Sequence, residues 1–134
     1  TSRIARHASI SSENTVNFDF PYQGPQHATL TLRQHPSYGR DAILSIEQGQ
    51  ILCYSYDGCT IRVRFDDSPA TTWRAASAAD NSTTSNFLRA ESRFVERMQK
   101  SKIVRIQVSI YQEGSPTFEF RVGGFSASRH RGSD

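Results

Sequence analysis

The stretch DAILSIEQGQILCYSYDGCTIRVRFDD, residues 41–67, contains both cysteines of the chain and its clearest strand pattern. From residue 59 to residue 66, CTIRVRFD, apolar and polar side chains alternate strictly. A period of two is typical of a strand with one buried face. The stretch therefore predicts a central hairpin, with residues 59–65 as its second arm and the first arm ending near Cys53.

Two connections between these arms fit the sequence, and they place the cysteines differently. A tight type I′ turn at Asp57-Gly58 puts the cysteines on opposite faces, because the register sets one face of a strand pair. A five-residue loop instead places Cys53 opposite Cys59 and Ile51 opposite Ile61. The second register is favoured because it buries Ile51 and brings the thiols within bridging distance. The cysteines form either one disulfide in an oxidising compartment or two buried thiols, and the spacing favours the disulfide.

Similar alternation predicts further strands over residues 15–20, 27–33, 42–47, 71–75, 104–111 and 118–122. An apolar stripe of helical period predicts one helix at 90–100. We therefore expect a mainly β fold of about seven or eight antiparallel strands. The form is a β-sandwich or a strongly curled sheet, with the α-helix before the C-terminal hairpin and closing one end.

Length and composition predict a single globular domain. The chain has 134 residues, of which 36% are hydrophobic and 22% charged. Residues 14–125 are expected to form the domain, 1–13 a flexible arm that can tether it, and 126–134 a flexible tail. The net charge of +3 is best explained by solvated basic ends, and the alternative is an acidic partner such as nucleic acid, lipid head groups or wall polymers.

No pattern indicates catalysis, a metal or a cofactor. The four histidines are scattered without ligand spacing. Neither a nucleophile elbow nor a glycine-rich phosphate loop before a helix occurs. Adjacent Asp66 and Asp67 fit a solvated turn better than acid/base work, because neighbouring strand residues point to opposite faces. We expect a protein that is not an enzyme and that has no cofactor.

The loop between the cysteines is the first candidate for binding. Tyr54, Tyr56 and Asp57 would form a rigid amphipathic projection if the cysteines bond. Such surfaces bind proteins or glycans at a low cost in conformational entropy. The alternative interpretation is that both tyrosine rings lie back over the sheet.

Basic side chains on predicted outer faces form the second candidate. Arg62 and Arg64 share one face of the strand over residues 59–65, and Arg105 and Tyr111 share one face of the later strand. Exposed aromatic and basic side chains on a barrel-like sheet can bind single-stranded nucleic acid. Outward arginine also solvates a sheet and discourages edge pairing. A cytoplasmic nucleic-acid-binding β-domain is therefore the alternative hypothesis.

Two segments together carry a resemblance to a known group: ATLTLRQHPSYGRDAILSIEQGQILCYSYDGCTIRVRFDD and FVERMQKSKIVRIQVSIYQEGSPTFEFRVGGF. Over about residues 14–125 the chain resembles small exported or lipid-anchored β-domains of the bacterial envelope. The order of paired cysteines, strand, helix and two strands is also similar to the invasion-associated locus B type of periplasmic protein. The resemblance implies export and supports the disulfide, and it carries no catalytic role.

Together these features predict a non-enzymatic binding domain, either periplasmic or anchored to the outer membrane as a lipoprotein. Its partner would be an envelope or host protein, or a glycan, and its role that of an inhibitor or an assembly factor. Membrane contact would occur only through an anchor at the N-terminal arm.

Overall fold

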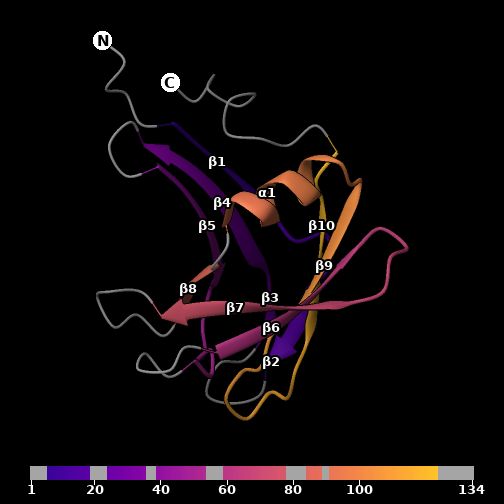
Figure 1. The fold of residues 1–134 in the computed structure, drawn as a ribbon. Coiled ribbons are helices and arrows are strands. Elements are labelled where there is room, and N and C mark those ends of the chain that lie inside the picture. The colour runs from indigo at the N-terminus through magenta and orange to yellow at the C-terminus, as the bar shows by residue number, and fades with distance from the viewer. Residues whose placement is uncertain are drawn as a thin grey trace.

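The computed structural model describes residues 6–18, 24–35, 39–53, 59–77, 84–88 and 91–123. Within these residues the chain forms ten strands and one helix (Figure 1). The strands are β1 (Arg6–Ser11), β2 (Val16–Phe18), β3 (Gly24–Gln26), β4 (Ala28–His35), β5 (Gly39–Ile46), β6 (Cys59–Phe65), β7 (Thr71–Ser77), β8 (Ser85–Leu88), β9 (Ile103–Gln107) and β10 (Thr117–Arg121). The helix α1 (Glu91–Gln99) lies between β8 and β9 in the chain, which confirms the predicted helix before the C-terminal hairpin.

Eight strands form one antiparallel sheet in the order β1-β4-β5-β8-β7-β6-β9-β10. β2 and β3 pair separately as a two-stranded sheet. The large sheet curls until its edge strands β1 and β10 approach each other, so that it nearly closes into a barrel (Figure 1). Strand twist accumulates in one direction, which allows a sheet with one apolar face to wrap around its own core. The expected curled antiparallel sheet is confirmed.

The residues that follow β1 cover the edge of β10 at the seam of the barrel. The backbone N–H of Glu13 donates to the carbonyl oxygen of Glu119 at 2.7 Å. The side-chain amide of Asn14 donates to the carbonyl of Thr117 at 2.9 Å and accepts from the N–H of Glu119 at 2.8 Å. Asn14 thus acts like a backbone peptide group. Polar groups on the edge of β10 that would otherwise pair with another strand are satisfied within the chain.

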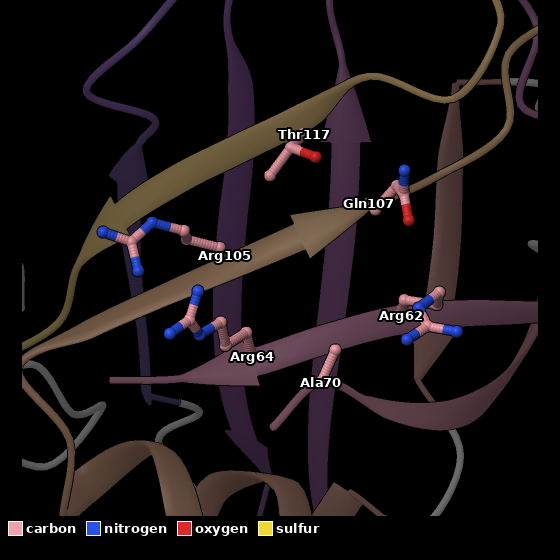
Figure 2. A pocket seen from close by; sticks show the side chains of 6 residues that line it. All are labelled: Arg62, Arg64, Ala70, Arg105, Gln107 and Thr117. Carbon is pink, nitrogen blue, oxygen red and sulfur yellow. The ribbon is translucent and has the colours of Figure 1, made fainter. Parts of the chain in front are cut away.

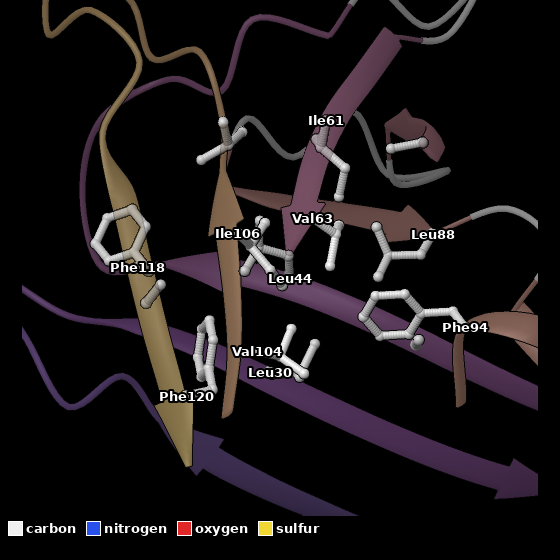
Figure 3. Close-up of a cluster of buried hydrophobic side chains, with 14 of the residues drawn as sticks. Leu30, Leu44, Ile61, Val63, Leu88, Phe94, Val104, Ile106, Phe118 and Phe120 are labelled. Atoms are coloured by element: carbon white, nitrogen blue, oxygen red, sulfur yellow. The ribbon is translucent and has the colours of Figure 1, made fainter. Parts of the chain in front are cut away.

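Side chains from all parts of the sheet fill the inside of the barrel (Figure 3). Along β6, Ile61, Val63 and Phe65 are buried and the residues between them are exposed, as the alternation predicted. β9 and β10 show the same alternation. The largest fully buried side chains include Phe94, Phe118, Phe120, Leu30, Leu44, Ile61, Met98, Ile106 and Ile110.

The helix α1 lies across one end of the barrel (Figure 1), as expected from its apolar stripe. Phe94 from α1 packs edge-on against Phe65 and Trp73, with ring centroids 5.7 Å and 5.5 Å apart. Arg97 places its guanidinium carbon 4.4 Å from the ring centroid of Phe65, and Arg93 lies 5.6 Å from that of Trp73. Cationic side chains therefore cover the aromatic cluster on the outside.

The predicted central hairpin is wrong, although its strands exist. β5 pairs with β4 and β8, whereas β6 pairs with β7 and β9. Ile61 lies opposite Trp73, and Ile51 forms an isolated bridge with Ile110. The backbone leaves β5 after Ile46 and turns at Gly49, where φ is +103°. The register prediction assumed one continuous arm up to Cys53, and this turn breaks that continuity.

Cys53 and Cys59 nevertheless form the expected disulfide. The bond joins the start of β6 to the end of an irregular segment rather than two paired strands. The cysteines are partly buried and pack against the core. The disulfide thus adds a covalent bond at Cys53 to the backbone contacts that hold residues 50–52 beside residues 109–111.

The N-terminal arm expected at residues 1–13 is also partly wrong. Arg6–Ser11 is a full strand, β1, paired along its length with β4. Ala8 lies opposite Leu32 and is buried, and Ile10 lies opposite Leu30. Ala8 and Ile10 are the apolar residues of this strand, so its alternation is weak in the sequence. The backbone pairing with β4 that holds β1 in place leaves no pattern in the sequence. The predicted tail at 126–134 lies outside the described residues.

Candidate binding surface

Alternation along β6 and β9 places a cluster of polar side chains on the outer face of the barrel. Arg62 lies opposite Gln107 and Arg64 lies opposite Arg105. Together with neighbours on both sides they line a hollow of about 220 Å³ that opens to solvent (Figure 2). We call it the arginine hollow, and it is lined by Arg62, Arg64, Ala70, Arg105, Gln107 and Thr117. The outward positions predicted for the three arginines are confirmed.

The arginine hollow concentrates positive charge. Arg64 and Arg105 are directly opposite each other on neighbouring strands (Figure 2), a like-charge arrangement that is unfavourable by itself. Nε of Arg105 donates to Oε1 of Glu119 at 3.0 Å, and Nε of Arg64 donates to the carbonyl of Ser68 at 3.2 Å. Arg62 has no ion pair with any residue that the structure describes. No carboxylate lines the hollow itself, so its net charge is positive.

A second surface lies where Gln50–Leu52 runs beside Ser109–Tyr111. The N–H of Leu52 donates to the carbonyl of Ser109 at 2.9 Å, and the N–H of Tyr111 donates to that of Gln50 at 2.8 Å. Ile51 and Ile110 bridge and are buried, so their chain neighbours point outward. Leu52 is 39% exposed and Tyr111 is 49% exposed.

Among the described residues these are the large hydrophobic side chains that stand exposed. They lie diagonally across one short ribbon, within reach of each other for long side chains. The ribbon leads directly into Cys53 and the disulfide. We call Leu52 and Tyr111 the apolar pair.

The structure describes part of the predicted site. Tyr54, Tyr56 and Asp57 lie outside the described residues, so their prediction stays open. Tyr111 shares its outward side with Arg105, as predicted, but lies beyond the end of β9.

Sequence reasoning missed three surface residues, Leu52, Gln107 and Thr117. The alternation that marked Ile51 and Ile106 as buried also carried the signal for Leu52 and Gln107 as outward positions. The alternation before Phe118 likewise marked Thr117 as an outward position, but its place directly opposite Gln107 depends on the register of β9 and β10.

The turn after β6 has a structural role that the sequence did not indicate. Oδ1 of Asp66 accepts hydrogen bonds from the backbone N–H groups of Lys102 and Ile103, both at 2.9 Å. The bond from Ile103, followed by that from Lys102, lowers the pKa of Asp66 below 3.8. This carboxylate therefore joins the turn after β6 to the start of β9, and it is not an acid/base candidate.

We expect acid to remove this contribution to stability. Because the folded pKa of Asp66 is below its unfolded value, its stabilisation is present above about pH 4 and is lost as the pH falls through the folded pKa. Urea unfolding between about pH 2 and pH 6 should show a weaker acid dependence for Asp66→Asn than for the wild type. The control is Asp67→Asn, which removes a neighbouring exposed carboxylate without touching the two N–H groups. Equal profiles for Asp66→Asn and the wild type would contradict the role of these bonds.

Other sites of chemistry find no support in the described part of the chain. Its His, Cys, Asp and Glu residues form no group of three that could hold a metal ion. His27 bonds through Nδ1 to the carbonyl of Ser12 at 3.0 Å, which is a structural contact. Within the described residues, no helix is long enough and apolar enough to span a membrane.

The resemblance to exported envelope domains stays a prediction that rests on the sequence pattern. Comparison with protein-family models, curated proteins and solved structures gave no significant match.

Proposed function

We propose that this protein is a non-catalytic binding domain of an oxidising compartment, periplasmic or anchored to the outer membrane. It contacts an envelope or host component, a protein or a glycan, through the end of the barrel that carries the disulfide. The observation that carries this proposal is the apolar pair, Leu52 and Tyr111, exposed on one ribbon beside Cys53.

The ribbon has the features of a binding surface that is ordered before its partner arrives. Its backbone is held by the two hydrogen bonds on either side of the Ile51–Ile110 bridge. The disulfide fixes the chain immediately after Leu52. A rigid surface loses little conformational entropy on binding, and tyrosine supplies a large amphipathic contact area. Residues 54–58 follow Cys53 in the sequence, and we propose that Tyr54 and Tyr56 extend the same surface.

The disulfide supports the choice of compartment. Disulfides persist in extracellular and periplasmic environments, whereas the cytosol keeps thiols reduced. A count of free thiols in the denatured, unreduced protein from its native cells should give none. Two free thiols would contradict the proposed compartment.

The binding role is tested by co-sedimentation of the purified, disulfide-bonded protein with isolated envelopes of a Gram-negative bacterium. We expect the wild type to bind saturably. Leu52→Ser and Tyr111→Ser should each weaken binding by about fivefold or more, because truncating a central interface anchor typically costs more than about 1 kcal/mol. The double variant Tyr54→Ala/Tyr56→Ala should weaken binding as well.

The matched control is Lys100→Ser, an exposed substitution after α1, which should bind like the wild type. The proposal would be overturned if the wild type did not bind. It would also be overturned if the variants of the apolar pair and the variant Tyr54→Ala/Tyr56→Ala all bound like the wild type. Each variant should first show the wild-type midpoint of thermal unfolding.

One observation favours a second candidate function. Three arginines lie together in one hollow, and proteins that bind single-stranded nucleic acid use positively charged grooves to contact its backbone. That function would give steeply salt-dependent binding to single strands. Retention on a single-stranded DNA column at low salt separates it from the first proposal.

A further inference from the structure

We infer that the arginine hollow is an anion subsite for an acidic glycan, whose chain continues along the outer face toward the apolar pair. This inference rests on the proposed binding function and assigns a chemical class to the ligand. The arginines of the hollow are different residues from the apolar pair, which carries the proposed function and in which Tyr111 forms the far end of the proposed glycan path.

The outer face of β9 and its continuation forms one track. Arg105, Gln107, Ser109 and Tyr111 alternate with the buried residues between them and so point to the same side. Six residues of extended chain span about 20 Å, which is the length of several sugar units. One end of the track is cationic, its middle carries amide and hydroxyl groups, and its far end is aromatic. A polymer fits this order better than a single small molecule.

The arginine hollow has the size and chemistry for one anionic group. Its volume of about 220 Å³ is below the range of about 300–1,000 Å³ typical of pockets that enclose a whole small ligand. Guanidinium groups present forked N–H donors that match the oxygens of sulfate, phosphate and carboxylate. A bound anion would also relieve the repulsion between Arg64 and Arg105, of which only Arg105 has an acidic partner within the described residues.

The side chains around the hollow favour an acidic glycan over nucleic acid. Nucleic-acid-binding grooves stack successive bases on aromatic rings beside the phosphate contacts, and no aromatic residue lines the hollow. Tyr111 offers one ring at the far end of the track, and an amphipathic ring can also pack against a sugar. The disulfide points to a compartment rich in envelope or surface glycans rather than nucleic acid. A membrane surface is less suitable, because these arginines line a hollow on a sheet and the lining of the hollow contains no large apolar side chain that could enter lipid.

The test uses a heparin octasaccharide as the sulfated probe, with its desulfated, N-acetylated form and a single-stranded oligothymidine as comparisons. Affinities are measured by isothermal titration calorimetry over a series of salt concentrations. We expect heparin to bind more tightly than either comparison. Arg62→Ala/Arg64→Ala should weaken heparin binding by about tenfold or more, because hydrogen bonds to charged groups are among the strong ones, and should lower its salt dependence.

The matched control is Lys100→Ala/Lys102→Ala, which removes the same net charge near α1 and keeps the hydrogen bond that the backbone N–H of Lys102 donates to Asp66. It should change heparin affinity by less than about threefold. Equal losses in both double variants would mean that only net charge is sensed, and would overturn the inference. Tighter binding of oligothymidine, weakened by the arginine variant, would assign the hollow to nucleic acid instead.

The two proposals can fail separately. Envelope binding that is lost in Leu52→Ser but kept in Arg62→Ala/Arg64→Ala, without heparin binding, would leave the proposed function standing and overturn the anion subsite. Heparin binding that depends on the arginines, without envelope binding, would leave the anion subsite standing and overturn the proposed function.

Discussion

Replacing Phe94 with alanine is expected to lower the free energy of unfolding by about 3–5 kcal/mol. Phe94 is fully buried and makes edge-on contacts with Phe65 and Trp73. It is the largest of the three buried side chains by which α1 joins the core of the barrel, the others being Val95 and Met98. Alanine would leave a cavity between the helix and the sheet, and the rigid strands around it cannot collapse to fill the space.

The measurement is urea unfolding followed by tryptophan fluorescence, because Trp73 is the only tryptophan and contacts Phe94. Gln99→Ala, an exposed change at the end of the same helix, is the control and should stay within about 0.5 kcal/mol of the wild type. Phe94→Leu fills part of the space and should fall between the two, which keeps the test informative if the alanine variant does not fold. A loss below about 1 kcal/mol for Phe94→Ala would contradict the packing of Phe94 between the helix and the sheet.

The second large effect is expected for Gly49→Ala. Gly49 has a φ of +103°, where a residue with a side chain is strained by roughly 1–3 kcal/mol. A Cβ at this position would lie 2.9 Å from Cε2 of Phe18 and 3.5 Å from Cγ2 of Ile110. Phe18 is buried, so relieving the contact would move part of the core at a further cost of about 1–3 kcal/mol.

Gly24 provides a control matched in backbone conformation. Its φ is +102°, and nothing lies within 4 Å of the Cβ that alanine would add. Gly24→Ala therefore measures the backbone strain alone, and the difference between the two variants measures the contact with Phe18. Thermal and urea unfolding should both rank the wild type above Gly24→Ala, and Gly24→Ala above Gly49→Ala. Equal losses for the two variants would contradict the close packing at Gly49.

The position of Gly49 also matters for the candidate surface. The turn at Gly49 takes the chain out of β5 and onto the ribbon that carries Leu52. The disulfide holds the other end of that segment at Cys53. The exposed ribbon is therefore fixed at both ends, and Gly49→Ala is expected to disturb binding as well as stability.

The candidate site was only partly predictable from the sequence. Alternation alone placed Arg62 and Arg64 outward, because the side chains of a strand must point to opposite faces in turn. That Arg105 joins them follows from the pairing of β6 with β9, which no local pattern carries. The apolar pair likewise depends on Ile51 meeting Ile110, residues far apart in the chain.

The sequence by itself determined which side chains are buried in the well-patterned strands, where the helix lies and the C-terminal hairpin, and it favoured the bond between two nearby cysteines. These features depend on local periodicity or on short separation along the chain. Only the tertiary structure decided which strands are neighbours, and it replaced the expected hairpin of β5 and β6 by the pairs β5–β8 and β6–β9. Strands bond through their backbones, which are alike in every strand, and the entropy of closing a longer loop rises only slowly with length. The choice of partners therefore falls to the packing of the whole core, which also brings the arginines and the apolar pair to one outer face.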